Sequence, residues 1–210
     1  MIGGKRPGVT LIETLVAATI FVIIVVAMTA AYLQSTRAGQ QIAIRSRLES
    51  DGRYALEAIS RAIRVYAIDY AAYAAPAGPL PAQPMTELCL KQPDVRGGQL
   101  RIRRETTDAG CYNDGKSFPC MVVSTDAVSA CDASGSWAPL TPQNTKIEYA
   151  SFYASPANDP LYVSTITNDY AANAAERVTV VLGLHGLAAR PADEWVLNLQ
   201  TTVTPRLYRR

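Results

Sequence analysis

The stretch GVTLIETLVAATIFVIIVVAMTAAY, from Gly8 to Tyr32, determines how the rest of this chain is interpreted. Its 24 residues from Val9 to Tyr32 contain one charged side chain, Glu13. A helix of that length would span roughly 36 Å, because each residue adds about 1.5 Å, and this is enough to cross the hydrocarbon core of a bilayer. The stretch therefore predicts a membrane-spanning helix.

Glu13 needs a counter-charge in such a helix. An ionised carboxylate in hydrocarbon costs about 2.5 to 3.5 kcal/mol on insertion scales. No Lys, Arg or His occurs between Val9 and Tyr32, so the partner has to come from another chain or from a new N-terminus. Cleavage after Gly8 would create one, because Val9 would then carry a free α-amine four residues before the carboxylate.

The sequence GVTLIETLVA resembles the processing site of type IV prepilins and the related pseudopilins. The resemblance implies that Gly8 ends a basic leader, that Val9 is the N-methylated first residue of the mature chain, and that Glu13 pairs with the α-amine of a neighbouring subunit. It also implies a prepilin peptidase, other pilin or pseudopilin subunits and an inner-membrane assembly platform as partners. Two positions depart from the family, which usually has Phe at Val9 and a basic or small residue at Pro7. The Val9 departure favours a minor pilin over a major one.

A second, shorter resemblance lies in SDGRYALEAISRAIRVY, from Ser50 to Tyr66. This segment is similar to the end of the long helix in PilW-type minor pilins and in J-type minor pseudopilins, where GRYAL is followed by an R-x-x-R pattern. Here that pattern runs from Arg61 to Arg64. An ordinary solvated helix face would show the same residues. The two resemblances cover about the first 70 residues, one third of the chain.

The periodicity of the residues after Leu33 predicts that the helix continues with two faces. No proline occurs between Val9 and Ala75, which permits one helix of some 58 residues from Val9 to Tyr66. One face carries apolar or small residues at spacings of three and four, the pattern of a buried stripe: Ile44, Leu48, Gly52, Ala55, Ile59, Ile63 and Tyr66. The other face alternates in charge every four residues, and each such pair stabilises a helix by about 0.2 to 0.5 kcal/mol: Glu49, Arg53, Glu57 and Arg61.

Composition then divides the chain into five parts. These are a basic leader (1–8), a transmembrane and assembly helix (9–32), an amphipathic second half of the helix (33–68), a Pro/Ala-rich connection (69–97) and a head (98–210). Alternating apolar residues and turn signals predict strands in the head, at 98–106, 120–125, 146–153, 176–184 and 194–206. We expect an α+β fold in which an antiparallel sheet packs on the second half of the helix. The pilin resemblance implies the same architecture.

The four cysteines lie close together in the sequence, at Cys89, Cys111, Cys120 and Cys131. An even count in a domain outside the cytoplasm predicts two disulfides, and four cysteines allow three pairings that the sequence does not rank securely. We favour Cys89 with Cys111 and Cys120 with Cys131. No C-x-x-C spacing occurs, and the single histidine, His185, is distant in sequence, so we expect no zinc site.

The sequence carries no motif of an enzyme. G-x-S-x-G, H-E-x-x-H and Gly-rich phosphate loops are absent, and His185 is expected in a turn. The DASGS run at 132–136 lacks the acidic spacing of a calcium loop. The net charge of +2 comes from dispersed residues, which argues against nucleic acid as a partner. We therefore expect neither enzymatic activity nor a cofactor or metal ion.

Together these patterns predict a minor pilin, a structural subunit of a type IV pilus that supports its assembly or adhesion. The alternatives are a minor pseudopilin of type II secretion and, in a different class, a membrane-anchored extracytoplasmic enzyme or ligand-binding domain. A secretory signal peptide is a further alternative, with Lys5 and Arg6 as its basic region and a cleavage site near Ala30.

We expect a single pass through the cytoplasmic (inner) membrane, surrounded by lipid before assembly, with the head outside the cytoplasm. The chain would then enter an extracellular pilus or a periplasmic pseudopilus. Basic residues lie on both sides of the apolar run, Lys5 and Arg6 before it and Arg37 and Arg45 after it, so the positive-inside rule does not fix the orientation. The orientation is inferred from the cysteines and the prepilin resemblance.

Overall fold

The computed structural model describes most of the chain, and its contacts divide into two units. The described residues are 8, 10–73, 79–92, 98–107, 111–112, 118–126, 131, 135–143, 145–160, 162–163, 174–186 and 194–205. The N-terminal unit comprises residues 1–43 and the C-terminal unit residues 44–210, and each is considered by itself. Val9 and residues 1–7 of the predicted leader lie outside the described residues.

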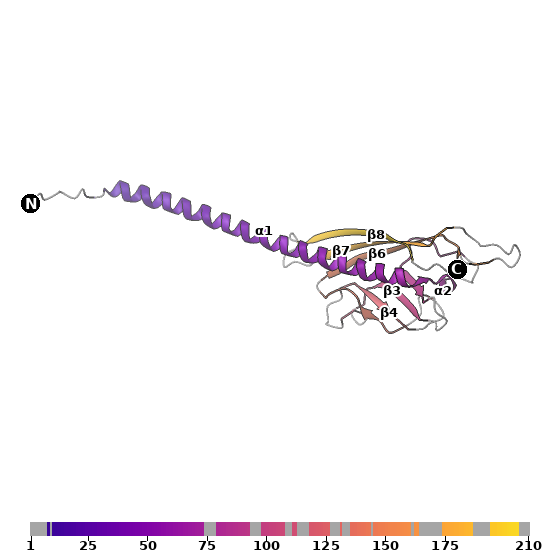
Figure 1. Cartoon of the computed structure of the whole chain (residues 1–210). Helices are drawn as coiled ribbons and strands as arrows, with labels where there is room; N and C mark the ends of the chain where they lie inside the picture. The colour runs from indigo at the N-terminus through magenta and orange to yellow at the C-terminus, as the bar shows by residue number, and fades with distance from the viewer. Residues whose placement is uncertain are drawn as a thin grey trace, which may run out of the picture. The chain divides into compact units, whose positions relative to one another are not determined.

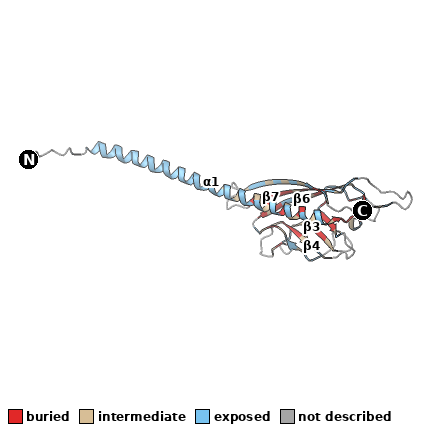
Figure 2. Ribbon diagram, viewed as in Figure 1, coloured by how far each residue is buried: buried red, intermediate tan, exposed pale blue. Residues whose placement is uncertain are grey.

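One long helix, α1 (Leu11–Val65), accounts for 55 residues (Figure 1). It ends one residue before the predicted end at Tyr66, and it contains no proline that would interrupt its hydrogen bonds. Within the C-terminal unit, α1 buries a single stripe, shown as red turns in Figure 2: Leu48, Gly52, Ala55, Ile59, Ser60 and Ile63. The predicted stripe is confirmed from Leu48 to Ile63, whereas Ile44 and Tyr66 at its ends are only partly buried.

The opposite face of α1 carries the predicted ion pairs. Arg53 contacts Glu49 at 2.7 Å, and Arg61 contacts Glu57 at 3.2 Å. All four side chains are largely exposed, so water screens each pair and its contribution stays at a few tenths of a kcal/mol.

The strands form two antiparallel sheets, whereas the sequence analysis described one. The five-stranded sheet runs in the order β1 (Ala67–Ile68), β2 (Glu87–Lys91), β3 (Gln99–Glu105), β4 (Cys120–Ser124) and β5 (Ala138–Pro139), with the short helix α2 (Tyr70–Tyr73) between β1 and β2. The three-stranded sheet runs in the order β6 (Thr145–Ser155), β7 (Arg177–Gly186) and β8 (Trp195–Val203). The α+β class and the antiparallel pairing are thus confirmed.

β2 lies inside the segment that composition assigned to a connection. Its five residues, ELCLK, place Leu88 and Leu90 between Glu87, Cys89 and Lys91, an alternation of only two apolar residues. Prolines precede and follow this short run, which suggested an irregular segment. Residues Glu87 to Leu90 are all buried in the structure, so both faces of the strand are covered.

A single core joins the stripe of α1 to both sheets. Leu88, Ile102 and Met121 reach it from the five-stranded sheet, and Phe152, Leu182 and other residues reach it from the three-stranded sheet. Met85, which precedes β2, exchanges backbone hydrogen bonds of 2.8 and 3.0 Å with Phe152 of β6. The side chain of Arg104 adds a bond of 2.8 Å from Nε to the carbonyl oxygen of Ile147.

On the outer face of the three-stranded sheet, the ring of Tyr149 lies across Gly183. Gly183 pairs with Tyr149 on one side and with Asn198 on the other, and the Tyr149 hydroxyl is 3.0 Å from Asn198 Oδ1. A Cβ atom on Gly183 would come within 2.6 Å of Tyr149 Cδ1, so only glycine leaves room for the ring. The three strands are thereby tied together by one side chain.

We predict that Gly183→Ala destabilises the C-terminal unit by about 1 to 3 kcal/mol, because the added methyl group displaces the Tyr149 ring. Chemical unfolding followed by tryptophan fluorescence measures this. In a Tyr149→Ala background the same substitution should cost much less, since the ring is no longer there. Equal costs in both backgrounds would show that the ring and the glycine are not coupled.

Candidate functional site

The N-terminus of α1 is capped by Thr10. The backbone N–H of Glu13 donates to the Thr10 carbonyl at 3.1 Å and lies 3.4 Å from the Thr10 hydroxyl oxygen. Thr10 and Glu13 thus occupy the first and last positions of the T-x-x-E pattern that begins many helices. Glu13 lies in the first turn, where the helix dipole favours a negative charge. Gly8 is exposed, with no atom within 4 Å of the position of an added Cβ.

The apolar part of α1 has no cover within the N-terminal unit. Every residue from Thr10 to Gln40 is exposed, and large side chains range from 44% exposed at Val25 to 83% at Leu11. This helix is long and apolar enough to cross a membrane, with a mean hydropathy of 2.6 over its most apolar window. Monomeric soluble proteins rarely expose an apolar area of this extent. Such an area usually contacts a membrane or another protein.

Threonine side chains within this segment satisfy their own hydrogen bonds. The hydroxyls of Thr14, Thr19 and Thr29 each donate to a backbone carbonyl one turn earlier, at 2.8 Å. These groups can therefore enter an apolar environment without an unpaired donor. By contrast, the Glu13 carboxylate makes no hydrogen bond or ion pair with any described residue.

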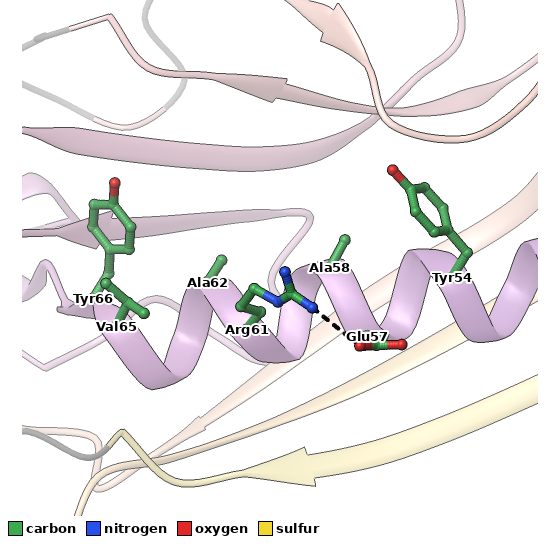
Figure 3. A pocket seen from close by; sticks show the side chains of 7 residues that line it. All are labelled: Tyr54, Glu57, Ala58, Arg61, Ala62, Val65 and Tyr66. Carbon is green, nitrogen blue, oxygen red and sulfur yellow. Dashed lines mark hydrogen bonds and ion pairs between the residues drawn. The ribbon is translucent and has the colours of Figure 1, made fainter.

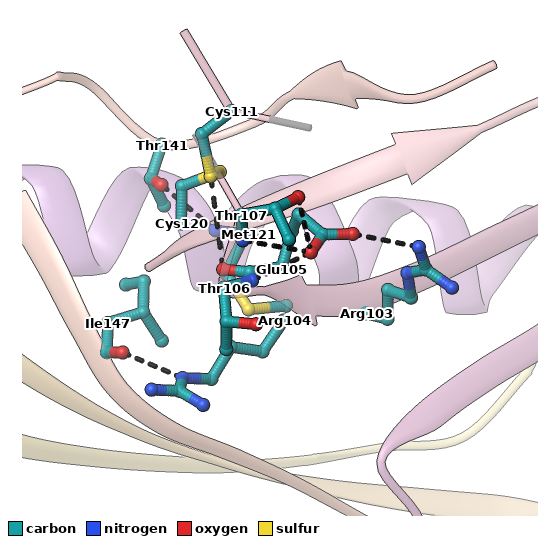
Figure 4. Close-up of a disulfide and its surroundings, with 10 residues drawn as sticks. All are labelled: Arg103, Arg104, Glu105, Thr106, Thr107, Cys111, Cys120, Met121, Thr141 and Ile147. Carbon is teal, nitrogen blue, oxygen red and sulfur yellow. Dashed lines mark hydrogen bonds and ion pairs between the residues drawn. A yellow bond between two sulfur atoms is a disulfide. The ribbon is translucent and has the colours of Figure 1, made fainter. Parts of the chain in front are cut away.

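The four cysteines form two disulfides, as predicted, but the favoured pairing was wrong. The bonds join Cys89 to Cys131 and Cys111 to Cys120, with Cα separations of 6.2 and 6.0 Å. Cys120 is paired across the sheet with Glu105, and the Cys111 sulfur lies 3.8 Å from the Glu105 carbonyl oxygen, so Cys111 and Cys120 both lie at this end of the β3–β4 pair (Figure 4). The register of the β3–β4 pair determines this bond, and that register could not be read from the sequence.

The Cys89–Cys131 disulfide joins β2 to a residue that lies beyond β4 in the sequence. Cys89 lies within β2, and the backbone N–H of Cys131 donates to the carbonyl of Ala72 in α2 at 3.1 Å. The bond therefore spans 42 residues and holds Cys131 itself beside β2 and α2.

Next to the Cys111–Cys120 disulfide, Glu105 accepts four hydrogen bonds. The donors are the Thr106 N–H, the Thr107 N–H and hydroxyl, and Arg103, at distances of 2.8 to 3.1 Å (Figure 4). Burial alone would raise the pKa of Glu105, but these bonds favour the ionised form and lower its pKa to about 2. Glu105 is thus an ionised anchor for the end of β3.

A buried arginine organises the outer side of the five-stranded sheet. Arg101 is 1% exposed, and its guanidinium lies 3.6 Å from the Glu87 carboxylate and 4.7 Å from the centre of the Trp137 ring. Arg103 stacks on the same ring at 4.1 Å. A Cβ atom at Gly135 would collide with the Arg101 guanidinium, so any larger residue there would displace that group from its position beside Trp137. Sequence analysis missed this cluster because its members come from β2, β3 and residues 135–137.

His185 lies in β7 and not in a turn as predicted. Its Nε2 atom is 3.0 Å from a Glu194 oxygen, and its Nδ1 atom is 3.9 Å from a Glu148 oxygen. The imidazole is therefore within hydrogen-bond distance of Glu194, which precedes β8, and lies near but beyond that distance from Glu148 of β6. Among the described residues, no group of three His, Cys, Asp or Glu side chains could hold a metal ion.

The exposed face of α1 in the C-terminal unit carries a hollow of about 430 Å³. Figure 3 shows Tyr54 and Tyr66 at its two ends, Ala58 and Ala62 between them, and the Glu57–Arg61 ion pair beside them. Sequence analysis overlooked Tyr54, although these four residues recur at a spacing of four. The small alanine side chains leave the space that the two rings enclose.

Comparisons of this chain with models of protein families, with curated proteins and with solved structures find no match. The functional argument therefore rests on the residues themselves.

We predict that proteolysis under non-reducing conditions releases one peptide pair containing Cys89 and Cys131 and another containing Cys111 and Cys120. The chain-entropy model assigns about 4 kcal/mol to the longer loop and about 3 kcal/mol to the shorter one. A Cys111→Ser/Cys120→Ser variant should retain the other bond. Recovery of a Cys89–Cys111 peptide would contradict the structure.

We predict that Glu105→Gln lowers the unfolding free energy at pH 7 by about 1 to 3 kcal/mol, because the four donors lose a charged acceptor. The folded-state pKa lies below the unfolded value of 4.5, so this stabilisation is present above pH 4.5 and is lost as the pH falls to about 2. Unfolding curves at several pH values should therefore converge for the two proteins at low pH. Glu57→Gln, at an exposed ion pair, should change stability by less than about 0.5 kcal/mol.

Proposed function

We propose that this chain is a minor subunit of a type IV pilus, inserted in the cytoplasmic membrane, cleaved after Gly8, methylated at Val9 and then incorporated into a filament. The observation that carries the proposal is the first turn of α1. There an exposed apolar helix presents one carboxylate, Glu13, with no partner among the described residues. Prepilin peptidase, other pilin subunits and an assembly platform are the partners that the proposal requires.

The energetics favour a partner from another molecule. The capped N-terminus of α1 stabilises a nearby carboxylate by about 0.3 to 1 kcal/mol, which is less than the about 2.5 to 3.5 kcal/mol that the membrane environment costs. An α-amine on a neighbouring subunit would supply the missing interaction. After cleavage, the Val9 amine would be four residues from Glu13 in the sequence. Each subunit would then offer one cation and one anion to its neighbours.

The rest of the apolar helix supports assembly with copies or relatives of this chain. Transfer from lipid to a bundle of helices exchanges one apolar environment for another, so close packing provides the driving force. Small residues permit helices to approach closely, and the segment contains several of them: Ala17, Ala18, Ala27, Ala30 and Ala31.

The C-terminal unit supports placement outside the cytoplasm. Its two disulfides persist in oxidising compartments, and both tie the five-stranded sheet to its connecting segments. Among the residues that the structure describes, its buried polar side chains hold strands together and do not converge on a cleft that would suit a substrate. This favours a structural subunit over a tethered enzyme, and a pseudopilin of a secretion system remains the alternative within the same class.

The test is whether Glu13 is needed for incorporation and dispensable for insertion. Glu13→Ala and Glu13→Gln variants, expressed with the native filament system in place of the parent chain, should reach the membrane fraction in normal amounts. They should be absent, or at least tenfold depleted, in filaments sheared from the cell surface. Thr14→Ala, a neighbouring exposed residue, serves as the control and should be incorporated normally.

Incorporation of Glu13→Ala at the parent level would contradict the proposal. Incorporation of the parent chain only into filaments that remain in the periplasm would favour the pseudopilin alternative. A parent chain found in the membrane fraction alone would favour the tethered domain.

A further inference from the structure

The outer edge of β8 is open in the part of the chain that the structure describes. The three-stranded sheet runs β6, β7, β8, and β8 pairs with β7 over nine consecutive residues without a bulge (Figure 1). No described segment pairs with its other edge. An edge strand of this length presents a row of backbone N–H and C=O groups to a further strand.

β8 also lacks the features that usually protect an edge. Natural edge strands carry charges, prolines or bulges, or are very short. The sequence of β8, WVLNLQTTV, contains no charged residue and no proline. Its register with β7 is continuous from Trp195 to Val203. Nothing in this strand opposes the addition of another.

The apolar layer between this sheet and α1 is incomplete at β8. Inward residues of β7, including Leu182 and Leu184, are fully buried, whereas Leu197 and Leu199 of β8 are only partly buried against the same core. Since β8 is the last strand of the sheet, no neighbouring strand covers the outer side of these two leucines among the described residues. A further strand with apolar inward residues would cover them.

A hollow of about 120 Å³ lies at this position. Its lining comes from α1 and from the first residues of β8, with no contribution from β7, so it lies on the open side of β8: Arg45, Leu48, Glu49, Trp195, Val196 and Leu197. A cavity of about 150 Å³ accommodates benzene, so this one suits a side chain of the size of leucine. Arg45, which stacks on Trp195 at 5.3 Å, and Glu49 form its polar rim.

We propose that the open edge of β8 binds an extended segment of another polypeptide, which adds to the three-stranded sheet as a fourth strand and places an apolar side chain in the hollow beside Leu197. The partner segment would be free of proline, with Val, Ile or Leu at alternate positions. Main-chain hydrogen bonds would supply affinity, and the hollow would select the side chain. This binding site is separate from Glu13 and does not depend on the proposed function.

The probe is a synthetic peptide with the sequence RVTVVLGLHG, which copies Arg177 to Gly186. The structure already pairs this sequence with β8, and its residues Val178, Val180, Leu182 and Leu184 all face the core. On the open edge it would offer the same alternation. Fluorescence anisotropy of the labelled peptide with the full-length chain in nanodiscs, with empty nanodiscs as the blank, measures binding.

We expect saturable binding, and a peptide with its four inward residues replaced by serine should bind at least tenfold more weakly. Leu197→Lys places a charge toward the hollow and should weaken binding at least tenfold. Gln200→Lys, at an exposed residue of β8 that does not line the hollow, should change it by less than about twofold. If Leu197→Lys does not fold, as judged by circular dichroism, the serine peptide decides the outcome.

Hydrogen exchange distinguishes edge addition from strand exchange. Bound peptide should increase protection of the β8 amides and leave protection of the β7 amides unchanged. Equal affinity of the two peptides, equal affinity of the two lysine variants, or loss of β7 protection would each overturn the proposal.

Discussion

The apolar half of α1 carries one electrostatic constraint, the carboxylate of Glu13 in its first turn. The hydroxyls of Thr14, Thr19 and Thr29 in the same segment donate to the helix backbone and need no other partner. Thr10 caps the helix by accepting from the backbone N–H of Glu13. This bond does not neutralise the charge of the Glu13 carboxylate. A second chain is the simplest source of the missing cation, and on this ground we propose that the chain assembles with others.

In the C-terminal unit, one face of α1 packs against two small sheets in a single core. The stripe from Leu48 to Ile63 supplies the centre of the core. Arg104 of β3 bonds to Ile147 of β6, and Met85, just before β2, bonds to Phe152 of β6. The two disulfides, the Glu105 anchor and the Arg101–Trp137 stack all fasten segments that leave the five-stranded sheet.

Sequence patterns predicted the features that repeat along a single element. The helix stripe, the Glu49–Arg53 pair and the later strands all follow periodicities of 3.6 or 2 residues, which are local properties. Features that depend on how strands pair were not accessible. β2 is a five-residue strand that follows a proline-rich segment, so its pairing with β3 was not predicted, and the partner of Cys111 depends on the register between β3 and β4. The two glutamates around His185 converge only after the sheet has formed. The hollow at Tyr54 was open to prediction from its four-residue spacing and was overlooked.

The central claim is that a new amine is created beside Glu13, and the intact mass of the chain purified from its native membrane tests it most directly. The account predicts a mature protein that lacks residues 1–8 and carries one added methyl group on Val9. A mass that includes Met1, or one that corresponds to cleavage near Ala30, would contradict the account and leave Glu13 without a partner.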